Sequence, residues 1–283
     1  MSVKIIADST CDLSKELLER YDISVLPLHI VLGDKEYKDG LEISPDEIYQ
    51  WSNKNNAAPK TSAASISDAM EIFNTYMKTY DEIICFSISG QMSTTVNVLR
   101  MAAEELEAED KIHIIDSENL STGGGLLVIE AAIMAADGKN GNEIVNTIEQ
   151  LKPQVRASFI VDTLTFLHRG GRCSGVAALA GGALKLHPKI VVENGAMKPD
   201  KKYRGKMSSA ILTYAKDLEM QLKNAKTDRV FITHSGCEEE TIQSIYNFLE
   251  ELNLFNEILI TRAGGVISSH CGPGTLGVLF IEN

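Results

Sequence analysis

Residues 82–116 read EIICFSISGQMSTTVNVLRMAAEELEAEDKIHIID and contain one complete strand, loop, helix and strand. Short apolar runs at residues 82–87 and 112–116 are typical of buried strands, and apolar residues recur at helical spacing over residues 94–106. Strands joined by a crossover helix lie parallel in one sheet. The stretch therefore predicts an α/β fold.

The same alternation continues on both sides of this unit. A strand is expected at residues 3–7, and an extended run at residues 25–32 is expected to turn at Gly33-Asp34 into a hairpin with residues 36–38. The predicted helices are residues 14–21, 44–52, 67–78, 126–136 and 142–151. This half of the chain is expected to form a parallel sheet.

The second half begins after Lys152-Pro153, which ends the last of these helices. Its strands and helices alternate less regularly, which favours a mixed sheet. The expected strands are residues 157–161, 189–193, 229–233, 257–261 and 277–281, and the expected helices are 208–223 and 239–252. Because 283 residues exceed what one core usually serves, we expect two α/β domains, residues 1–155 and 156–283.

The composition is that of a folded protein that avoids anionic partners. Hydrophobic residues make up 44% and charged residues 23%, and the formal net charge is −12. We therefore expect no nucleic acid partner and at most transient membrane contact. The longest apolar stretch, residues 123–136, is too short to span a bilayer and predicts a buried helix. The N-terminus enters a strand without a signal layout, which predicts a cytoplasmic protein.

The five cysteines are expected to be reduced. They are odd in number and widely spaced, unlike a disulfide framework or a paired zinc motif. The closest metal-like pairs, His234 with Cys237 and His270 with Cys271, each supply too few ligands for a closed site. We expect no metal and no cofactor.

Candidate ligand contacts lie in polar loops, because ligands of an open α/β sheet collect at the carboxyl ends of its strands. These loops are residues 8–12, 60–65, 87–95 and 116–119. Their hydroxyls either cap the helices that follow or donate to a carboxylate or phosphate. Ser67, Thr94 and Thr122 are the expected caps. Ser93, next to Thr94, is then free to face the loop.

Neither glycine motif predicts a nucleotide site. Residues 272–277 match G-x-G-x-x-G but run straight into a predicted strand instead of opening a helix. Gly123-Gly124-Gly125 follows a strand but lacks the lysine and hydroxyl of a P-loop, so close backbone packing is the better interpretation.

The residues alone leave two kinds of function open. One is an α/β module that binds a nucleotide or a sugar. The other is a stand-alone acyl hydrolase, although the chain lacks a G-x-S-x-G elbow. Its candidate groups are His270 or His234 as base, Ser89 or Ser93 as nucleophile, and Asp116 to orient the base.

Arg172 follows Gly170-Gly171, a sequence that predicts a guanidinium on a tight, exposed turn. The arginine is either a functional contact or a solvated helix end, where a cation favours the helix dipole.

Six segments follow one another along nearly the whole chain. They are IIADSTCDL (residues 5–13), PLHIVLGDKEYKDG (27–40), PKTSAAS (59–65), FSISGQMSTT (86–95), VDTLTFLHRGGR (161–172) and HCGPGTLGVLFIE (270–282). Each segment alone is a weak signal. The ordered set closely resembles the DegV family of bacterial fatty-acid-binding proteins.

The resemblance implies two α/β domains with a lipid tunnel between them and one long-chain fatty acid as the ligand. By the same resemblance, the carboxyl group of that acid is bound or polarised by Thr61, Ser62, Ser93, Thr94 and His270.

The resemblance also implies a carrier that performs no chemistry alone. Some family members are the binding subunit of a bacterial fatty acid kinase. A separate ATP-binding subunit, related to dihydroxyacetone kinases, phosphorylates the bound acid, and the acyl phosphate enters phospholipid synthesis. Arg172 and Arg204 are the residues expected to contact that kinase subunit or the phosphate.

The chain departs from the family pattern in two loops. The usual T-S-Q-P-S is TSAAS at residues 61–65, and the usual S-G-x-x-S-G-T is SGQMSTT at residues 89–95. The hydroxyls remain while a proline and a glycine are lost, which implies a different loop shape and acyl preference.

Overall fold

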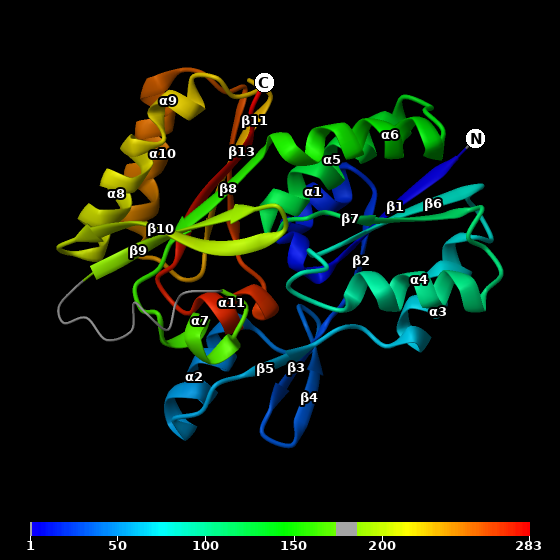
Figure 1. Cartoon of the computed structure of the whole chain (residues 1–283), viewed down its shortest axis with the longest axis horizontal. Coiled ribbons are helices and arrows are strands. Elements are labelled where there is room, and N and C mark those ends of the chain that lie inside the picture. The colour runs from blue at the N-terminus through cyan, green and yellow to red at the C-terminus, as the bar shows by residue number, and fades with distance from the viewer. Residues whose placement is uncertain (1, 174–185) are drawn as a thin grey trace.

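The computed structural model describes residues 2–173 and 186–283, which form two larger sheets and one small sheet (Figure 1). The first larger sheet has the order β2-β1-β6-β7, and its neighbouring strands are parallel. Its strands are β1 (Val3–Asp8), β2 (Ile23–Leu26), β6 (Glu82–Ser87) and β7 (Ile112–Asp116). The parallel sheet predicted for the first half is confirmed.

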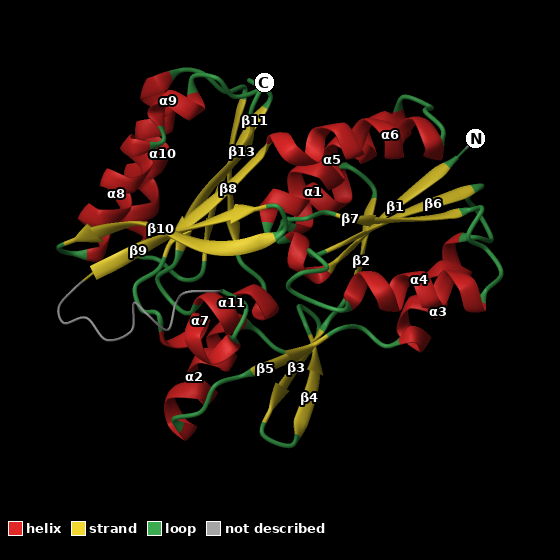
Figure 2. Ribbon diagram, viewed as in Figure 1, coloured by secondary structure: helices red, strands yellow, loops and turns green. Residues whose placement is uncertain are grey.

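Helices cover both faces of this sheet (Figure 2). The helices of the first half are α1 (Lys15–Arg20), α2 (Pro45–Asn55), α3 (Ile66–Tyr76), α4 (Thr95–Glu105), α5 (Thr122–Ala136) and α6 (Gly141–Leu151). Successive side chains of a strand point to opposite faces. Ile5 accordingly packs in the cluster that contains α5, whereas Ile6 packs with Phe73 of α3 and Leu99 of α4.

Helices α3 and α6 begin earlier than predicted because their caps are other residues than those expected. The cap of α3 is Ser65, whose hydroxyl accepts a hydrogen bond from the Asp68 N–H at 3.0 Å, and the predicted cap Ser67 lies inside the helix. The cap of α6 is Asn140 instead of Asn142. Both helices have an acidic residue three positions after the true cap, which completes a capping box. Helix α2 also begins with a capping box, formed by Ser44 and Glu47.

The apolar helix α5 lies between the two larger sheets. It contacts β1 of the first sheet and β8 and β13 of the second, so the prediction of a buried helix is confirmed. Its three glycines lie in the first turn of the helix, which begins before the predicted start at residue 126, and Thr122 is its first residue instead of its cap. A Cβ atom on Gly125 would lie 2.7 Å from the carbonyl oxygen of Cys11, which confirms the close backbone packing predicted for these glycines.

The small sheet is antiparallel, with the order β4-β3-β5. Its strands are β3 (His29–Leu32), β4 (Lys35–Lys38) and β5 (Lys60–Ser62). The predicted hairpin is confirmed, with Gly33 at φ 64° in its turn. The extended run predicted over residues 25–32 is divided between two sheets at Pro27, which has no N–H to donate. Residues 60–62, predicted as a loop, pair with β3.

The second larger sheet has the order β10-β9-β8-β13-β11-β12. Its strands are β8 (Val155–Ile160), β9 (Leu186–Glu193), β10 (Ala196–Arg204), β11 (Arg229–His234), β12 (Glu257–Arg262) and β13 (Leu276–Ile281). β11 pairs with β12 in parallel and with β13 antiparallel, so the predicted mixed sheet is confirmed. Helices α8 (Met207–Asp217), α9 (Glu219–Leu222) and α10 (Glu239–Leu252) accompany it, and a break at Leu218 divides the single helix predicted over residues 208–223.

Two short helices lie between the mixed sheet and the small sheet (Figure 1). They are α7 (Thr165–Gly170) and α11 (Gly265–Cys271), which contact each other. α11 also contacts α2, β3 and β5. After α11 the chain turns at Gly272 and enters β13, which confirms that residues 272–277 do not open a helix.

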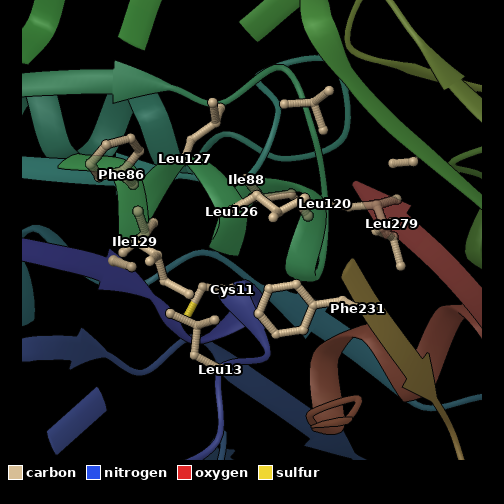
Figure 3. Close-up of a cluster of buried hydrophobic side chains, with 14 of the residues drawn as sticks. Cys11, Leu13, Phe86, Ile88, Leu120, Leu126, Leu127, Ile129, Phe231 and Leu279 are labelled. Carbon is tan, nitrogen blue, oxygen red and sulfur yellow. The ribbon is translucent and has the colours of Figure 1, made fainter. Parts of the chain in front are cut away.

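One hydrophobic cluster joins the two larger sheets (Figure 3). Phe86 and Ile129 from the first half pack in the same cluster as Phe231 and Leu279 from the second half. The molecule is therefore an α/β protein whose parallel-sheet and mixed-sheet domains share part of their core. Within the described ranges, no helix is long and apolar enough to cross a membrane.

Candidate ligand-binding site

A cavity of about 450 Å³ lies where β5, the loop after β6 and helix α11 meet. This volume is in the range of small-molecule sites. Its polar lining consists mainly of Thr61, Ser62, Gln91, Ser93, Thr94, Arg172 and His270. Its apolar lining consists mainly of Leu28, Ile88, Met92, Leu120, Met197, Val266, Ile267 and Cys271. The lining comes from both halves of the chain and combines one group of polar side chains with a larger apolar surface.

Thr61 and His270 form the central polar contact of this cavity. The Thr61 Oγ1 atom lies 2.8 Å from His270 Nε2, although the two residues are 209 positions apart in the chain. Burial, together with the charge of the Arg172 guanidinium, lowers the pKa of His270 to about 4. The imidazole is therefore neutral at pH 7. Its Nδ1 atom is buried and has no hydrogen-bond partner among the described residues.

The capping roles of Ser93 and Thr94 are the reverse of those predicted, although both residues line the cavity. The Ser93 hydroxyl accepts a hydrogen bond from the Thr95 N–H at 3.3 Å and lies 2.8 Å from the Thr95 hydroxyl, so Ser93 stabilises the start of α4. Thr94 occupies the N-cap position but makes no side-chain capping bond, and it is exposed at the cavity. A serine hydroxyl commonly accepts a hydrogen bond in this way from the backbone N–H group two residues further on, and the turn that results leads into a helix.

The loop that holds Ser93 is fixed by the turn between β9 and β10. The Ser89 hydroxyl donates to the carbonyl oxygen of Gly195 at 2.6 Å, and Gln91 Nε2 donates to the carbonyl oxygen of Asn194 at 2.6 Å. The N–H group of Ser93 in turn donates to the Ser89 carbonyl oxygen at 3.1 Å. The second domain therefore sets the position of a first-domain loop at the cavity.

The two arginines lie in different places. Arg172 follows Gly171, whose φ of 66° ends α7, and it is exposed as predicted. Its Nη1 atom donates to the Gly170 carbonyl oxygen at 2.6 Å, and its side chain lines the cavity. Arg204 is exposed at the end of β10 and does not line this cavity. Ser62 lines the cavity but is exposed, with its hydroxyl 3.4 Å from a Glu36 carboxylate oxygen.

Buried aspartates hold the N-terminus of the helix that carries His270. Asp12 accepts a hydrogen bond from the Gly264 N–H at 2.8 Å. Asp39 accepts from the N–H groups of Gly265 and Val266 at 2.8 and 3.3 Å. These are first-turn N–H groups, which have no partner within a helix. Residues 8–12 were expected to form a ligand loop, but Asp12 anchors α11 instead.

Burial changes the ionisation of these anchors. It raises the pKa of Asp12 to about 8, and it raises that of Asp39 above its ordinary value. The sequence did not identify Asp39 as a functional residue. A helix at residues 265–271 was not predicted, so no sequence pattern indicated that Asp39 would bind its N-terminus.

The groups considered for a hydrolase are not assembled. His270 contacts the hydroxyl of Thr61, and the Ser89 hydroxyl donates its hydrogen bond to the Gly195 carbonyl oxygen. Asp116 accepts hydrogen bonds from the Gly90 N–H at 3.1 Å instead of orienting a histidine. His234 Nδ1 accepts from the N–H group of Gly236 at 3.3 Å. The geometry therefore supports a binding cavity better than a serine–histidine pair.

A profile of the family described as "Uncharacterised protein, DegV family" matches residues 2–283. The chain belongs to the DegV family. One DegV domain-containing relative, from Caldanaerobacter subterraneus subsp. tengcongensis, is 32% identical over 289 residues and covers 99% of both chains. Protein DegV of Bacillus subtilis is 29% identical over 282 residues, with 98% of both chains covered.

Solved DegV structures share this fold. A fatty-acid-binding DegV family protein from Thermus thermophilus is 30% identical, with a TM-score of 0.92 and 100% of both chains covered. DegV of Bacillus subtilis, described as a fatty acid binding protein, is 28% identical, with a TM-score of 0.87 and 100% of both chains covered. The DegV family and the α/β fold class predicted from the sequence are confirmed.

Proposed function

We propose that this DegV protein binds one long-chain fatty acid in the 450 Å³ cavity. The carboxyl group lies among polar side chains of the lining, those of Thr61, Ser62, Ser93, Thr94 and His270. The observation that carries the proposal is the cavity itself, which places a hydroxyl–imidazole contact on an otherwise mainly apolar wall. The relatives from Thermus thermophilus and Bacillus subtilis are described as binding fatty acids, which supports the same ligand class here.

The acyl tail supplies most of the affinity in this proposal. A chain of about 16 carbons, desolvated at roughly 0.8 kcal/mol per methylene, offers on the order of 12 kcal/mol before the costs of binding. The carboxyl group then needs orientation more than a strong ion pair. A neutral imidazole and neutral hydroxyls provide that orientation without burying a second charge.

A calorimetric titration tests the binding step. Delipidated protein is titrated with palmitate and, as a matched control, with palmityl alcohol, which has the same chain but no carboxyl group. We expect one saturable site for palmitate and weaker binding of the alcohol. Equal affinity for the two would mean that the polar groups of the cavity do not bind the carboxyl group. No binding of either would overturn the proposal.

We further propose that the protein is a cytoplasmic carrier that presents the acid to a separate ATP-dependent fatty acid kinase subunit, of the dihydroxyacetone kinase type, and performs no chemistry alone. Arg172 is exposed at the cavity, where it can contact a partner or a phosphate bidentately. Arg204 is exposed away from the cavity, which suits a contact with the partner surface. The acyl phosphate formed in this way would supply phospholipid synthesis.

Two measurements on one preparation test this division of labour: lipid occupancy, and acyl phosphate formation with the kinase subunit and ATP. We expect Arg172→Ala, and more weakly Arg204→Ala, to keep the lipid and to lose partner-dependent phosphorylation. Arg100→Ala, an exposed change on α4, is the control. If Arg172→Ala loses the lipid as well, Arg172 belongs to the lipid site, and if it loses neither property, the arginine is a solvated helix end.

A further inference from the structure

A second, much smaller cavity shares part of its lining with the first. Its volume is about 10 Å³, and it lies between the carboxyl ends of β1 and β6 and the start of α5. Among the described residues, Ile88 and Leu120 line both cavities. The two side chains therefore form the wall that separates them.

This wall is buried and its backbone is held in place. Ile88 is 8% exposed and Leu120 is 4% exposed, and both belong to the hydrophobic cluster shown in Figure 3. The Ile88 N–H group donates to Asp8 Oδ2 at 2.8 Å, and the Ser89 N–H group donates to the carbonyl oxygen of Asn119 at 2.9 Å, which joins the loops that carry Ile88 and Leu120. Because the backbone is fixed on both sides, the size of these two side chains sets where the larger cavity ends.

We infer that Ile88 and Leu120 are the chain-length gauge of the acyl site, the wall that the last carbons of the bound chain meet. The inference rests on the proposed function, because it takes the tail to run from the polar groups into the apolar interior. Behind the wall, 10 Å³ holds at most one water molecule and no further methylenes. Removing carbons from the wall would join the two cavities and admit a longer chain.

The test compares saturated acids of different chain length by competition within each variant, so that a general loss of stability cancels. Ile88→Ala and Leu120→Ala should shift the preference toward longer acids, by roughly fourfold for each added methylene that becomes buried. Ile84→Ala is the matched control, because Ile84 is buried in the same cluster but lines neither cavity. Ile88→Val and Leu120→Val remove fewer atoms, and they replace any alanine variant that does not fold.

Refilling the space gives a second test. Gly124 lines only the small cavity of the two, and a Cβ atom on it would make ordinary contacts of 3.5 and 3.6 Å with Ser117. Adding Gly124→Ala to Ile88→Ala should therefore return the preference toward the wild-type chain length. Gly124→Ala alone should leave the preference unchanged.

The outcomes separate the gauge from the proposed function. If the wild-type protein binds none of the acids, the proposed function fails and the gauge fails with it. If the wild-type protein binds them but the wall variants keep the same ratio of affinities as Ile84→Ala, the gauge alone is overturned. A shift toward longer acids that Gly124→Ala reverses supports it.

Discussion

Thr61 and His270 meet at 2.8 Å with no full charge on either side chain. Such a pair can reverse its hydrogen bond, because a hydroxyl both donates and accepts and a neutral imidazole has one donor and one acceptor nitrogen. A carboxylate placed next to the pair would meet a donor. The same carboxylate would favour the protonated imidazole, since an opposite charge stabilises the charged form.

Thr61→Val tests the hydroxyl. Valine keeps the shape of threonine but removes the bond to His270 Nε2, so the fold should persist while fatty acid affinity falls by about 0.5 to 1.5 kcal/mol, roughly two- to tenfold. Thr61→Ser keeps the hydroxyl and should bind close to wild type. Titration of the three proteins with palmitate measures the effect. Affinity in Thr61→Val equal to that of wild type would make Thr61 a structural residue of β5.

The depressed pKa of His270 predicts a pH dependence of stability. The pKa is about 4 in the folded protein and ordinarily 6.5, so the unfolded chain binds the proton more tightly. The stability contributed by the neutral ring is therefore present above pH 6.5 and lost as the pH falls toward 4. Between pH 7 and pH 5 the loss should be about 2 kcal/mol.

Urea unfolding of wild type and His270→Gln at pH 7 and pH 5 measures how much of this loss in the free energy of unfolding comes from His270. The other buried groups, including Asp12 and Asp39, titrate in both proteins, so the difference between the two isolates His270. An equal change in both proteins would show that His270 is not held neutral by burial.

At this scale the sequence indicated which residue types to examine but not their contacts. Thr61 and His270 lie 209 positions apart, and only the family resemblance grouped them. The capping roles of Ser93 and Thr94 were assigned in reverse, because either of two adjacent hydroxyls satisfies the capping pattern. The structure places Thr61, Ser62, Ser93, Thr94, Arg172 and His270 around one cavity and leaves Arg204 outside it.

At the scale of elements, α11 determines the site. It has only seven residues and begins at Gly265, so neither its length nor its composition stabilises it alone. Its N-terminal N–H groups are satisfied by Asp12 and Asp39, which come from loops more than 200 residues away. These carboxyl groups hold one end of the helix and thereby position His270 at the other.

Asp39→Ala tests that anchoring. It leaves the N–H groups of Gly265 and Val266 without their acceptor, at a cost of about 1 to 3 kcal/mol for a buried group left unpaired. We expect a lower melting temperature, weaker fatty acid binding and a shifted imidazole signal of His270 in NMR spectra. Asp39→Asn keeps one acceptor oxygen and should restore part of all three. An unmoved imidazole signal in a destabilised Asp39→Ala would limit Asp39 to general stability.

Elements with a strong local signal were predictable, and those set by distant contacts were not. β6, α4 and β7 follow the predicted ranges because their apolar periodicity is complete within the segment. β10 is a lysine-rich edge strand that shows little apolar alternation, and α11 depends on anchors elsewhere in the chain. The division between β2 and β3 at Pro27 depends on which sheet accepts each strand, which local pattern does not reveal.

At the scale of the whole molecule, the parallel and mixed sheets were predicted from the order of the elements, whereas their shared core was not. Figure 3 shows side chains of both halves in one cluster, and α5 contacts both sheets. The domain boundary near residue 155 stays a prediction. The two halves share a core, so each can depend on the other for its stability. A cavity between the halves was implied only by the family resemblance, because its volume results from packing between the halves and has no local pattern in the sequence.

Native mass spectrometry of the protein purified from a bacterial host tests the central claim most directly, followed by solvent extraction to identify what was bound. We predict one fatty acid per chain and a melting temperature that falls on delipidation and recovers when the acid is returned, because a ligand bound only to the folded state stabilises it. A protein that carries no lipid, and whose melting temperature does not change with any long-chain fatty acid, would contradict the account.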